Sequence, residues 1–280
     1  MTAVDLHVHS TASDGHESPA ETVRRAHAAG LAAIALTDHD TLAGAAAVAE
    51  DPGPVRVVAG CEFSVAASWG EMHLLAYFLP LHDATLEAFL LDQRARRRAR
   101  GVEIVGRLNR LGVSLDYEDV EAQAGNAAMG RPHVARALVA RRAVADINAA
   151  FERYLAAGRP AFVPKVLPSV TEVLALVRSV GGVTSAAHLN ERGTLATISD
   201  LAAAGLDAVE VRHPSHADRT EQRIARAAAS CGLLFSGGSD WHGDAGRRSE
   251  RGALGSLNVP GAWLDGLEEL HVRRSGRVAA

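Results

Sequence analysis

The chain has 280 residues, a formal net charge of −4 and a hydrophobic fraction of 48%. This size fits one large α/β domain with an insertion, since α/β barrels run to about 250 residues as one domain. The charge excludes a globally basic nucleic-acid binder. Two cysteines without a CxxC spacing exclude a disulfide framework. With no signal-peptide pattern and no long apolar window, we expect a cytoplasmic protein without a membrane span.

Alternating strands and helices are predicted in the first part of the chain. Residues 4–6 are predicted to form a short buried strand. A capping box at Ser18, with Pro19 at the first helical position, starts a helix that ends near Gly30. Apolar runs bounded by turn residues predict the next buried strands, at 31–36, 55–59 and 73–78.

The hydrophobic periodicity becomes helical after residue 83. One long amphipathic helix is predicted up to about residue 111. Shorter helices are predicted at 132–141 and 147–157. The resulting division is a catalytic barrel of residues 1–82 and 165–280, and a mostly helical insertion of residues 83–164.

The strand and helix alternation resumes after the insertion. A second capping box at Ser169 opens a helix that stops at Gly181. Strands are predicted at 183–187, 208–211 and 233–236, helices at 200–204 and 218–230, and a frayed basic tail at 273–277. The alternation predicts a parallel sheet, and a barrel of this kind has its active site at the carboxyl ends of its strands.

Histidine and acidic side chains occur where these strands end. His7 and His9 close the first strand and, two residues apart, point to the same side. The other candidates at or near strand ends are Asp14, His39, Glu62, His73, His188, Asp240 and His242. Singly, Asp14 is typical of a turn and His73 of a satisfied core histidine. Together they are more polar side chains than a hydrophobic core can bury without partners. A set of imidazoles and carboxylates is suited to binding Mn, Fe or Zn.

Together these residues resemble the PHP (polymerase and histidinol phosphatase) family of phosphoesterases. The motifs are DLHVHS at 5–10, TDHDT at 37–41 and SDWHG at 239–243, together with Glu62, His73 and His188. The branch with 3′,5′-nucleotide bisphosphate phosphatases and 5′→3′ oligoribonucleases is similar in the helical insertion. It also resembles this chain in GRPH at 130–133 and YLAAGRP at 154–160.

The resemblance implies a distorted (β/α)7 TIM-like barrel that holds two or three divalent metals, with Mn²⁺ expected and Fe or Zn as alternatives. One metal would be held by His7, His9, Glu62 and Asp240, a second by Glu62, His73 and His188, and a third by Asp14, His39 and His242. The family usually has proline after the residue that matches His188. This chain has Leu189 there, which is expected to change the geometry of the loop that carries His188, a ligand of the second metal.

The expected chemistry is attack on phosphorus by a hydroxide that bridges the metals. Arg131 would clamp a phosphate through its planar guanidinium. His213 would bind the phosphate or protonate the leaving oxygen, and His133 is a weaker candidate for substrate contact. Alternatively, each of these three is an ordinary non-catalytic side chain. The arginines of 94–100 spread around a helix, which favours an ion-paired face over an RNA track.

Three functions fit these patterns. The favoured one is an enzyme that removes phosphate from 3′,5′-nucleotide bisphosphates or acts on the ends of short RNA. The second is a phosphatase of a small metabolite such as histidinol phosphate. The third is a non-catalytic PHP module. No obligate protein partner and no membrane partner is expected.

Overall fold

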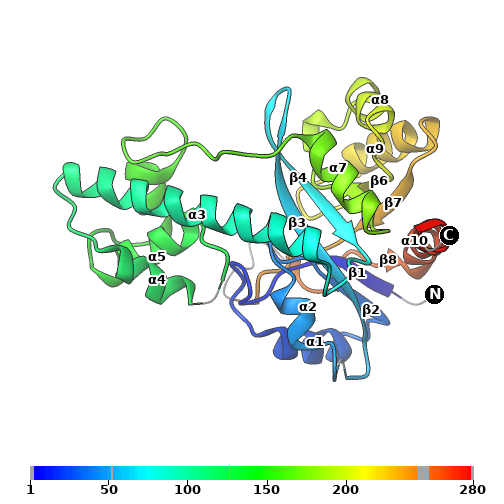
Figure 1. Cartoon of the computed structure of the whole chain (residues 1–280), viewed down its shortest axis with the longest axis horizontal. Coiled ribbons are helices and arrows are strands. Elements are labelled where there is room, and N and C mark those ends of the chain that lie inside the picture. Colours follow the sequence, from blue (N-terminus) through cyan, green and yellow to red (C-terminus); the bar gives the residue numbers. More distant parts are fainter. Residues whose placement is uncertain (1–2, 52, 126, 245–251, 279–280) are drawn as a thin grey trace. The chain divides into compact units, whose positions relative to one another are not determined.

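The computed structural model describes residues 3–51, 53–125, 127–244 and 252–278. The chain forms two compact units (Figure 1). The barrel unit comprises Met1–Glu87 and Leu167–Ala280, and the helical unit comprises Ala88–Val166. That the helical unit is an inserted domain with the predicted limits stays a prediction.

The barrel unit is built around an eight-stranded sheet in the order β7-β6-β5-β4-β3-β2-β1-β8. Its strands are β1 (Ala3–Val8), β2 (Ala33–Leu36), β3 (Arg56–Ala67), β4 (Gly70–Tyr77), β5 (Val183–Ala186), β6 (Ala208–Arg212), β7 (Leu234–Gly237) and β8 (Val259–Pro260). The predicted α/β barrel is therefore confirmed. Among the described residues, we find no helix with the length and apolar character that a membrane span requires.

The segment after β7 nearly closes the barrel against β1. The amide of His9 donates to the carbonyl of Trp241 over 2.9 Å, and Val8 forms a parallel bridge with the same residue. Gly238 packs directly on His7, where an added Cβ would stand 2.4 Å from the Cβ of His7. Only glycine permits so close an approach of two backbones, so this residue type is required for closure.

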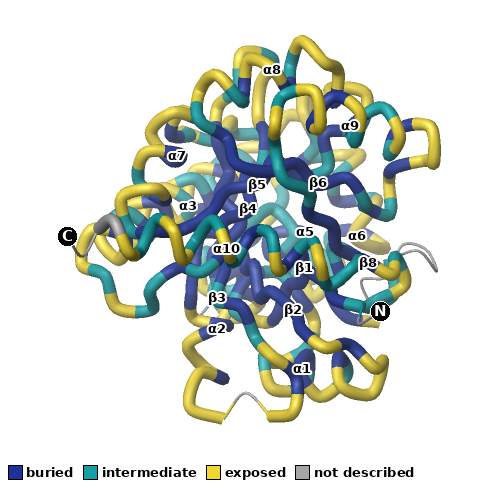
Figure 2. Tube along the Cα trace, turned by 90° about the vertical axis from the view of Figure 1, so that its right-hand side faces the viewer, coloured by how far each residue is buried: buried dark blue, intermediate teal, exposed yellow. Residues whose placement is uncertain are grey.

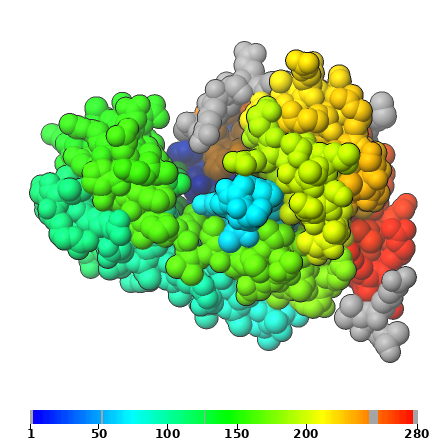
Figure 3. Space-filling model, turned by 90° about the horizontal axis from the view of Figure 1, so that it is seen from above, coloured from blue at the N-terminus to red at the C-terminus, as the bar shows by residue number. Residues whose placement is uncertain are grey.

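The prediction of a wholly parallel sheet is wrong at β4, which is antiparallel to both β3 and β5. The reason is the short connection of Ser68 and Trp69, which leaves no room for a crossover helix. The prediction that the third strand stops before Glu62 is also wrong. The strand continues to Ala67, so Glu62 lies inside β3, and His73 lies inside β4 rather than at its start. The tip of this hairpin reaches the surface (Figure 3, cyan).

Helices surround the strands of the barrel unit, and the strands are its most deeply buried part (Figure 2). The first begins at the predicted N-cap, where the hydroxyl of Ser18 accepts from the amide of Glu21. Gly30, with φ of 72°, follows its end. The helices of this unit are α1 (Pro19–Ala28), α2 (Ala43–Ala47), α7 (Val170–Ser179), a 3₁₀ turn (Asn190–Arg192), α8 (Leu195–Ala203), α9 (Asp218–Ser230) and α10 (Gly261–Val278).

The predicted frayed tail is wrong, because residues 273–277 belong to α10. Arg274 forms an ion pair with Asp207, at the amino end of β6, and donates to the carbonyl of Gly182 over 2.8 Å. Asp207 also accepts from the amide and the hydroxyl of Thr184, each over 2.9 Å. A buried carboxylate with this many donors anchors the helix to the barrel.

The helical unit has a core of its own, around Leu108, Leu115 and Leu138. Its helices are α3 (Ala84–Arg110), α4 (Tyr117–Ala124), α5 (Arg131–Ala140), α6 (Ile147–Ala150) and a π-helical turn (Phe151–Leu155). Two arginines of α3 bind main-chain carbonyls, Arg100 that of Val163 over 2.7 Å and Arg107 that of Phe162 over 2.6 Å. The arginine-rich helix therefore holds its own unit together.

Candidate metal centre

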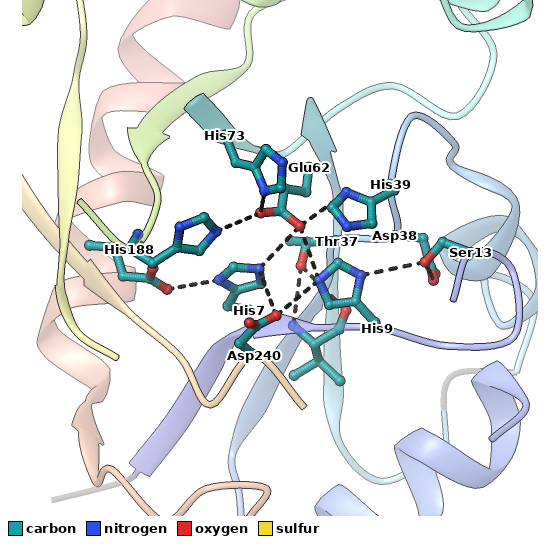
Figure 4. A network of polar contacts seen from close by, with 12 residues as sticks. His7, His9, Ser13, Thr37, Asp38, His39, Glu62, His73, His188 and Asp240 are labelled. Atoms are coloured by element: carbon teal, nitrogen blue, oxygen red, sulfur yellow. Dashed lines mark hydrogen bonds and ion pairs between the residues drawn. The ribbon is translucent and has the colours of Figure 1, made fainter. Parts of the chain in front are cut away.

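Histidine and acidic side chains from the strands, or from the loops after them, meet in the barrel unit. Their imidazole nitrogens and carboxylate oxygens point toward one another around one glutamate (Figure 4). The side chains in this cluster include His7, His9, His39, Glu62, His73, His188 and Asp240. The structure thus brings together residues from the two ends of the sequence, such as His7 and Asp240.

Glu62 lies at the middle of the cluster, and its side chain is only 2% exposed. Its Oε2 is 3.1 Å from Nε2 of His9 and 3.2 Å from Nδ1 of His39. Its Oε1 is 2.8 Å from Nδ1 of His73 and 3.1 Å from Nε2 of His188. One carboxylate therefore joins two groups of imidazoles.

Asp240 approaches the first group from the loop after β7. Its Oδ1 lies 3.4 Å from Nε2 of His7 and 3.4 Å from Nε2 of His9. Nε2 of His7 is also 3.4 Å from Oε2 of Glu62. These distances unite the four residues that the family resemblance assigns to one metal.

Asp14 gathers a further group in the loop after β1. Its Oδ1 is 3.3 Å from Nε2 of His242, and its Oδ2 is 4.0 Å from Nε2 of His39. The ring of His242 stacks on that of His9 with centroids 4.2 Å apart. His39 also faces Glu62, so it stands between this group and the first one.

Burial and charge pairing oppose each other throughout the cluster. Burial alone lowers the pKa of a histidine, but Asp240 and Glu62 outweigh it and raise the pKa of His9 to about 10. Burial raises the pKa of a carboxyl, but the imidazoles, His39 foremost, hold the pKa of Glu62 well below its usual range. Without a cation, the site therefore pairs an ionised carboxylate with protonated imidazole.

The donor atoms fit a shared divalent cation. Nε2 of His7, Nε2 of His9 and Nδ1 of His39 are buried and contact carboxylate oxygens without forming a hydrogen bond. Each lies between 3.1 and 3.4 Å from Oε2 of Glu62. Atoms that bind one ion at about 2.1 Å stand about 3.0–3.4 Å apart, so this spacing is that of neighbouring ligands. Buried nitrogens without a hydrogen bond are otherwise costly, and a cation would satisfy them.

Two residues of the cluster, and two more beside it in the same loops, have a positive φ although none is glycine. The values are 49° at Asp40, 31° at His188, 47° at Asn190 and 50° at Asp240. Such backbone conformations cost energy and persist where the surrounding structure holds them, often at functional sites. The strained backbone therefore marks the same loops as the clustered donors.

Two residues that orient the donors, Asp38 and Glu210, were not predicted from the sequence. Asp38 is buried and accepts from the hydroxyl of Ser13 over 2.7 Å, and Ser13 in turn lies 3.4 Å from Nδ1 of His9. Glu210 is buried inside β6 and lies 2.9 Å from Nδ1 of His7. An acidic residue within an apolar strand was the available signal for Glu210, which stands between Val209 and Val211.

His213, one of the predicted contacts with substrate, lies beside the cluster after β6. Its Nε2 is 3.4 Å from Oδ2 of Asp240. Its Nδ1 lies 2.7 Å from Oγ of Ser215, and that hydroxyl donates to Oδ1 of Asn190 over 2.8 Å. The Asn190 amide is oriented by its own donation to the carbonyl of His188. The main-chain amide of Ser215 also donates to Nδ1 over 3.1 Å, so Nδ1 faces Ser215 and Nε2 faces the cluster.

Arg131 and His133 lie in the helical unit, at the start of α5. Arg131 donates to the carbonyl of Leu155 over 3.2 Å, and its guanidinium lies 5.6 Å from the centroids of two phenylalanine rings. His133 is buried, and its Nδ1 accepts from the amide of Gly130. Both residues thus have local structural contacts, and their contact with substrate stays a prediction.

A family model described as the PHP domain matches residues 5–159. This segment spans more than half of the chain and contains six of the nine clustered metal-ligand candidates, from His7 to His73.

The chain is also similar to characterised relatives and to a solved structure. It is 34% identical over 245 residues to a 5′-3′ exoribonuclease of Haemophilus influenzae, covering 85% of this chain and 89% of that protein. It is 34% identical over 260 residues to a 3′,5′-nucleoside bisphosphate phosphatase of Chromobacterium violaceum, with coverage of 88% and 90%. A structure named as a metal-dependent phosphoesterase of Bifidobacterium adolescentis superposes with a TM-score of 0.86, 30% identity and 96% coverage of both chains.

Proposed function

Since this chain belongs to the PHP domain family and is a metal-dependent phosphoesterase, we propose that it removes phosphate from 3′,5′-nucleotide bisphosphates or from the ends of short RNA. The observation that carries the proposal is the arrangement around Glu62. Each of its oxygens faces imidazole nitrogens at ligand spacing. Such a site can hold cations side by side against one phosphoryl group.

We assign the metal ligands in three groups, as the resemblance implies. Glu62 belongs to two of them, and His39 stands between two. Bound divalent cations at this site would neutralise charge on the phosphoryl oxygens and lower the pKa of a bound water. We propose Mn²⁺ as the bound metal. A set of imidazoles and carboxylates without thiolate can bind Mn²⁺, and it can also bind Fe or Zn.

His213 is proposed to donate a hydrogen bond to the phosphate or a proton to the leaving oxygen. Its Nδ1 is occupied by Ser215, so only Nε2 faces the cluster. Nε2 lies 3.4 Å from Oδ2 of Asp240, so a hydrogen on this nitrogen points toward the metal cluster, where a phosphate would bind. His213 lies at the edge of the metal cluster. A proton donor at this position could reach a leaving oxygen that departs away from the metals.

Arg131 is proposed to bind a phosphate of the substrate through its guanidinium. This side chain has several N–H donors, and the carbonyl of Leu155 takes one of them. We expect Arg131→Ala to lose phosphatase activity while its metal content stays that of the wild type. Arg142→Ala, at an exposed position just after α5, is the matched control. Unchanged activity of the Arg131 variant would remove this residue from the proposed site.

The relatives favour a nucleotide substrate over a small metabolite such as histidinol phosphate, because both are named for nucleotide or RNA chemistry. The test is phosphate release from adenosine 3′,5′-bisphosphate, 5′-phosphorylated short RNA and histidinol phosphate, with Mn²⁺ and with chelator. Metal-dependent turnover of either nucleotide substrate supports the proposal. Turnover of histidinol phosphate alone would move the enzyme to the alternative substrate, with the same metal centre.

A further inference from the structure

Glu210 is a buried acid that none of the three proposed ligand groups includes. It lies in β6, its side chain is fully buried, and both neighbours in the strand are valines. A carboxylate in such a position is costly unless both oxygens receive hydrogen bonds. Oε1 lies 2.9 Å from Nδ1 of His7, and Oε2 accepts from the main-chain amide of His188 over 2.6 Å.

The contact with His7 selects which ring nitrogen carries the hydrogen. An ionised carboxylate only accepts, so Nδ1 of His7 must donate to it. In the neutral ring the hydrogen then sits on Nδ1, and Nε2 keeps its lone pair. That Nε2 is the atom that lies 3.4 Å from Glu62 and from Asp240. Glu210 therefore keeps the ligand lone pair of His7 directed at the first group.

The contact with His188 holds the main chain of that residue in an unfavourable conformation. His188 has a φ of 31°, a region that residues other than glycine rarely adopt. A charge-assisted hydrogen bond from its amide to Glu210 offsets part of this cost. The side chain so placed has Nε2 at 3.1 Å from Oε1 of Glu62, in the second group.

We propose that Glu210 is a positioning residue that sets two metal positions at once, the first through the tautomer of His7 and the second through the backbone of His188. The inference rests on the proposed function in one respect, that these two groups bind divalent cations. Outer carboxylates that orient metal-binding histidines commonly change metal affinity by about 10–100-fold when they are removed.

A glutamine at this position is a near-isosteric test, because it supplies one acceptor and one donor. Whichever way the amide turns, its NH₂ meets a group that needs an acceptor. Facing His7, it forces the ring hydrogen onto Nε2 and blocks the ligand atom. If the NH₂ of the glutamine faces His188, it meets the main-chain N–H of that residue, so two donors face each other and the amide of His188 loses its acceptor.

The experiment compares Mn²⁺ binding to the wild type, Glu210→Gln and Asp207→Asn. Asp207 is the matched control, since it precedes the same strand, is also buried, and contacts Thr184 and Arg274 instead of metal ligands. Calorimetric titration and metal analysis after gel filtration give affinity and stoichiometry without reference to turnover. We expect Glu210→Gln to bind Mn²⁺ about 10–100-fold more weakly at the position whose contact the amide NH₂ opposes, the first through His7 or the second through His188. Asp207→Asn should unfold at a lower temperature and keep the wild-type affinity.

Equal stoichiometry, with affinity within about twofold of the wild type, would overturn the inference for a folded Glu210→Gln. A wild type that binds no metal would sink the proposed function and this inference together, so the two failures are distinguishable. If the variant does not fold, long-range ¹⁵N–¹H correlation of the imidazoles in the Zn²⁺-loaded wild type decides the matter. A ring hydrogen of His7 on Nδ1 is expected, and one on Nε2 contradicts the role of Glu210.

Discussion

Two regions of the barrel unit contain buried carboxylates, and the groups that contact these carboxylates differ between the two regions. Near the amino end of β6, Asp207 receives hydrogen bonds from Thr184 and an ion pair from Arg274. In the metal centre, Glu62 faces imidazole nitrogens of which several have no hydrogen-bond partner. The first arrangement is complete within the protein, whereas the second requires a cation to complete it. Changes in the first region should therefore alter stability, and changes in the second should alter metal binding and turnover.

The largest effect is expected for Glu62→Gln. One amide cannot serve both groups of imidazoles, so we expect loss of metal and a fall in phosphate release of at least about 10³-fold, on the order of 4 kcal/mol in the barrier. Initial rates in excess Mn²⁺ measure it. Glu268→Gln removes an exposed carboxylate paired with Arg56 and serves as the control, with activity close to that of the wild type. A Glu62→Gln enzyme with more than about a tenth of wild-type activity would contradict the assignment.

Arg274→Met should have the largest effect on stability. It leaves the buried Asp207 with only the longer ion pair to Arg178, at 3.8 Å, which costs about 3 kcal/mol of unfolding free energy, the lower end of the range for a broken buried pair. At about 2–4 °C per kcal/mol, the melting temperature should fall by roughly 10 °C. Thermal unfolding measures this, and the exposed Arg273→Met is the control. Metal affinity well below the melting temperature should be unchanged, and a large loss would show that the two regions are coupled.

His213→Gln tests whether a group at the edge of the cluster transfers a proton. Glutamine can donate a hydrogen bond but cannot act as an acid, so we expect kcat to fall about 10²-fold with normal metal content. Ser215→Ala removes only the hydroxyl beside Nδ1 and should cost less. If both variants retain wild-type kcat, His213 acts neither as an acid nor as a phosphate contact.

The smallest effect concerns pH. The raised pKa of His9, about 10 against about 6.5 unfolded, stabilises the metal-free protein below pH 6.5. That contribution is lost as pH rises through about 10. Metal binding instead strengthens as pH rises, because fewer protons compete for the imidazoles. The melting temperature difference between Mn²⁺-loaded and chelated protein should therefore widen from about pH 6 to about pH 8.5. A constant or narrowing difference would contradict this linkage.

The donor cluster was accessible from the sequence because its members follow apolar runs. His7 and His9 share a side of one strand, and His188 and Asp240 follow two others. The direction of each strand could not be predicted, because an apolar run does not show whether the strand is parallel or antiparallel to its neighbours. The strand β4 is antiparallel to both of its neighbours, where a parallel strand was expected. Glu210 was missed because one acid in a strand has no spacing partner. The helix α10 was missed because glycines and a basic end resemble a tail, and its anchor, Asp207, lies 67 positions before Arg274.

The most direct test of the metal centre is the number of metal ions per chain. Metal-free protein loaded with Mn²⁺ and freed of excess by gel filtration is analysed by plasma mass spectrometry, beside Glu62→Gln prepared in the same way. We expect two or three ions for the wild type, as proposed, and a clear loss in the variant. Less than one ion in the wild type, or equal content in both proteins, would contradict the proposal that Glu62 joins neighbouring metal sites.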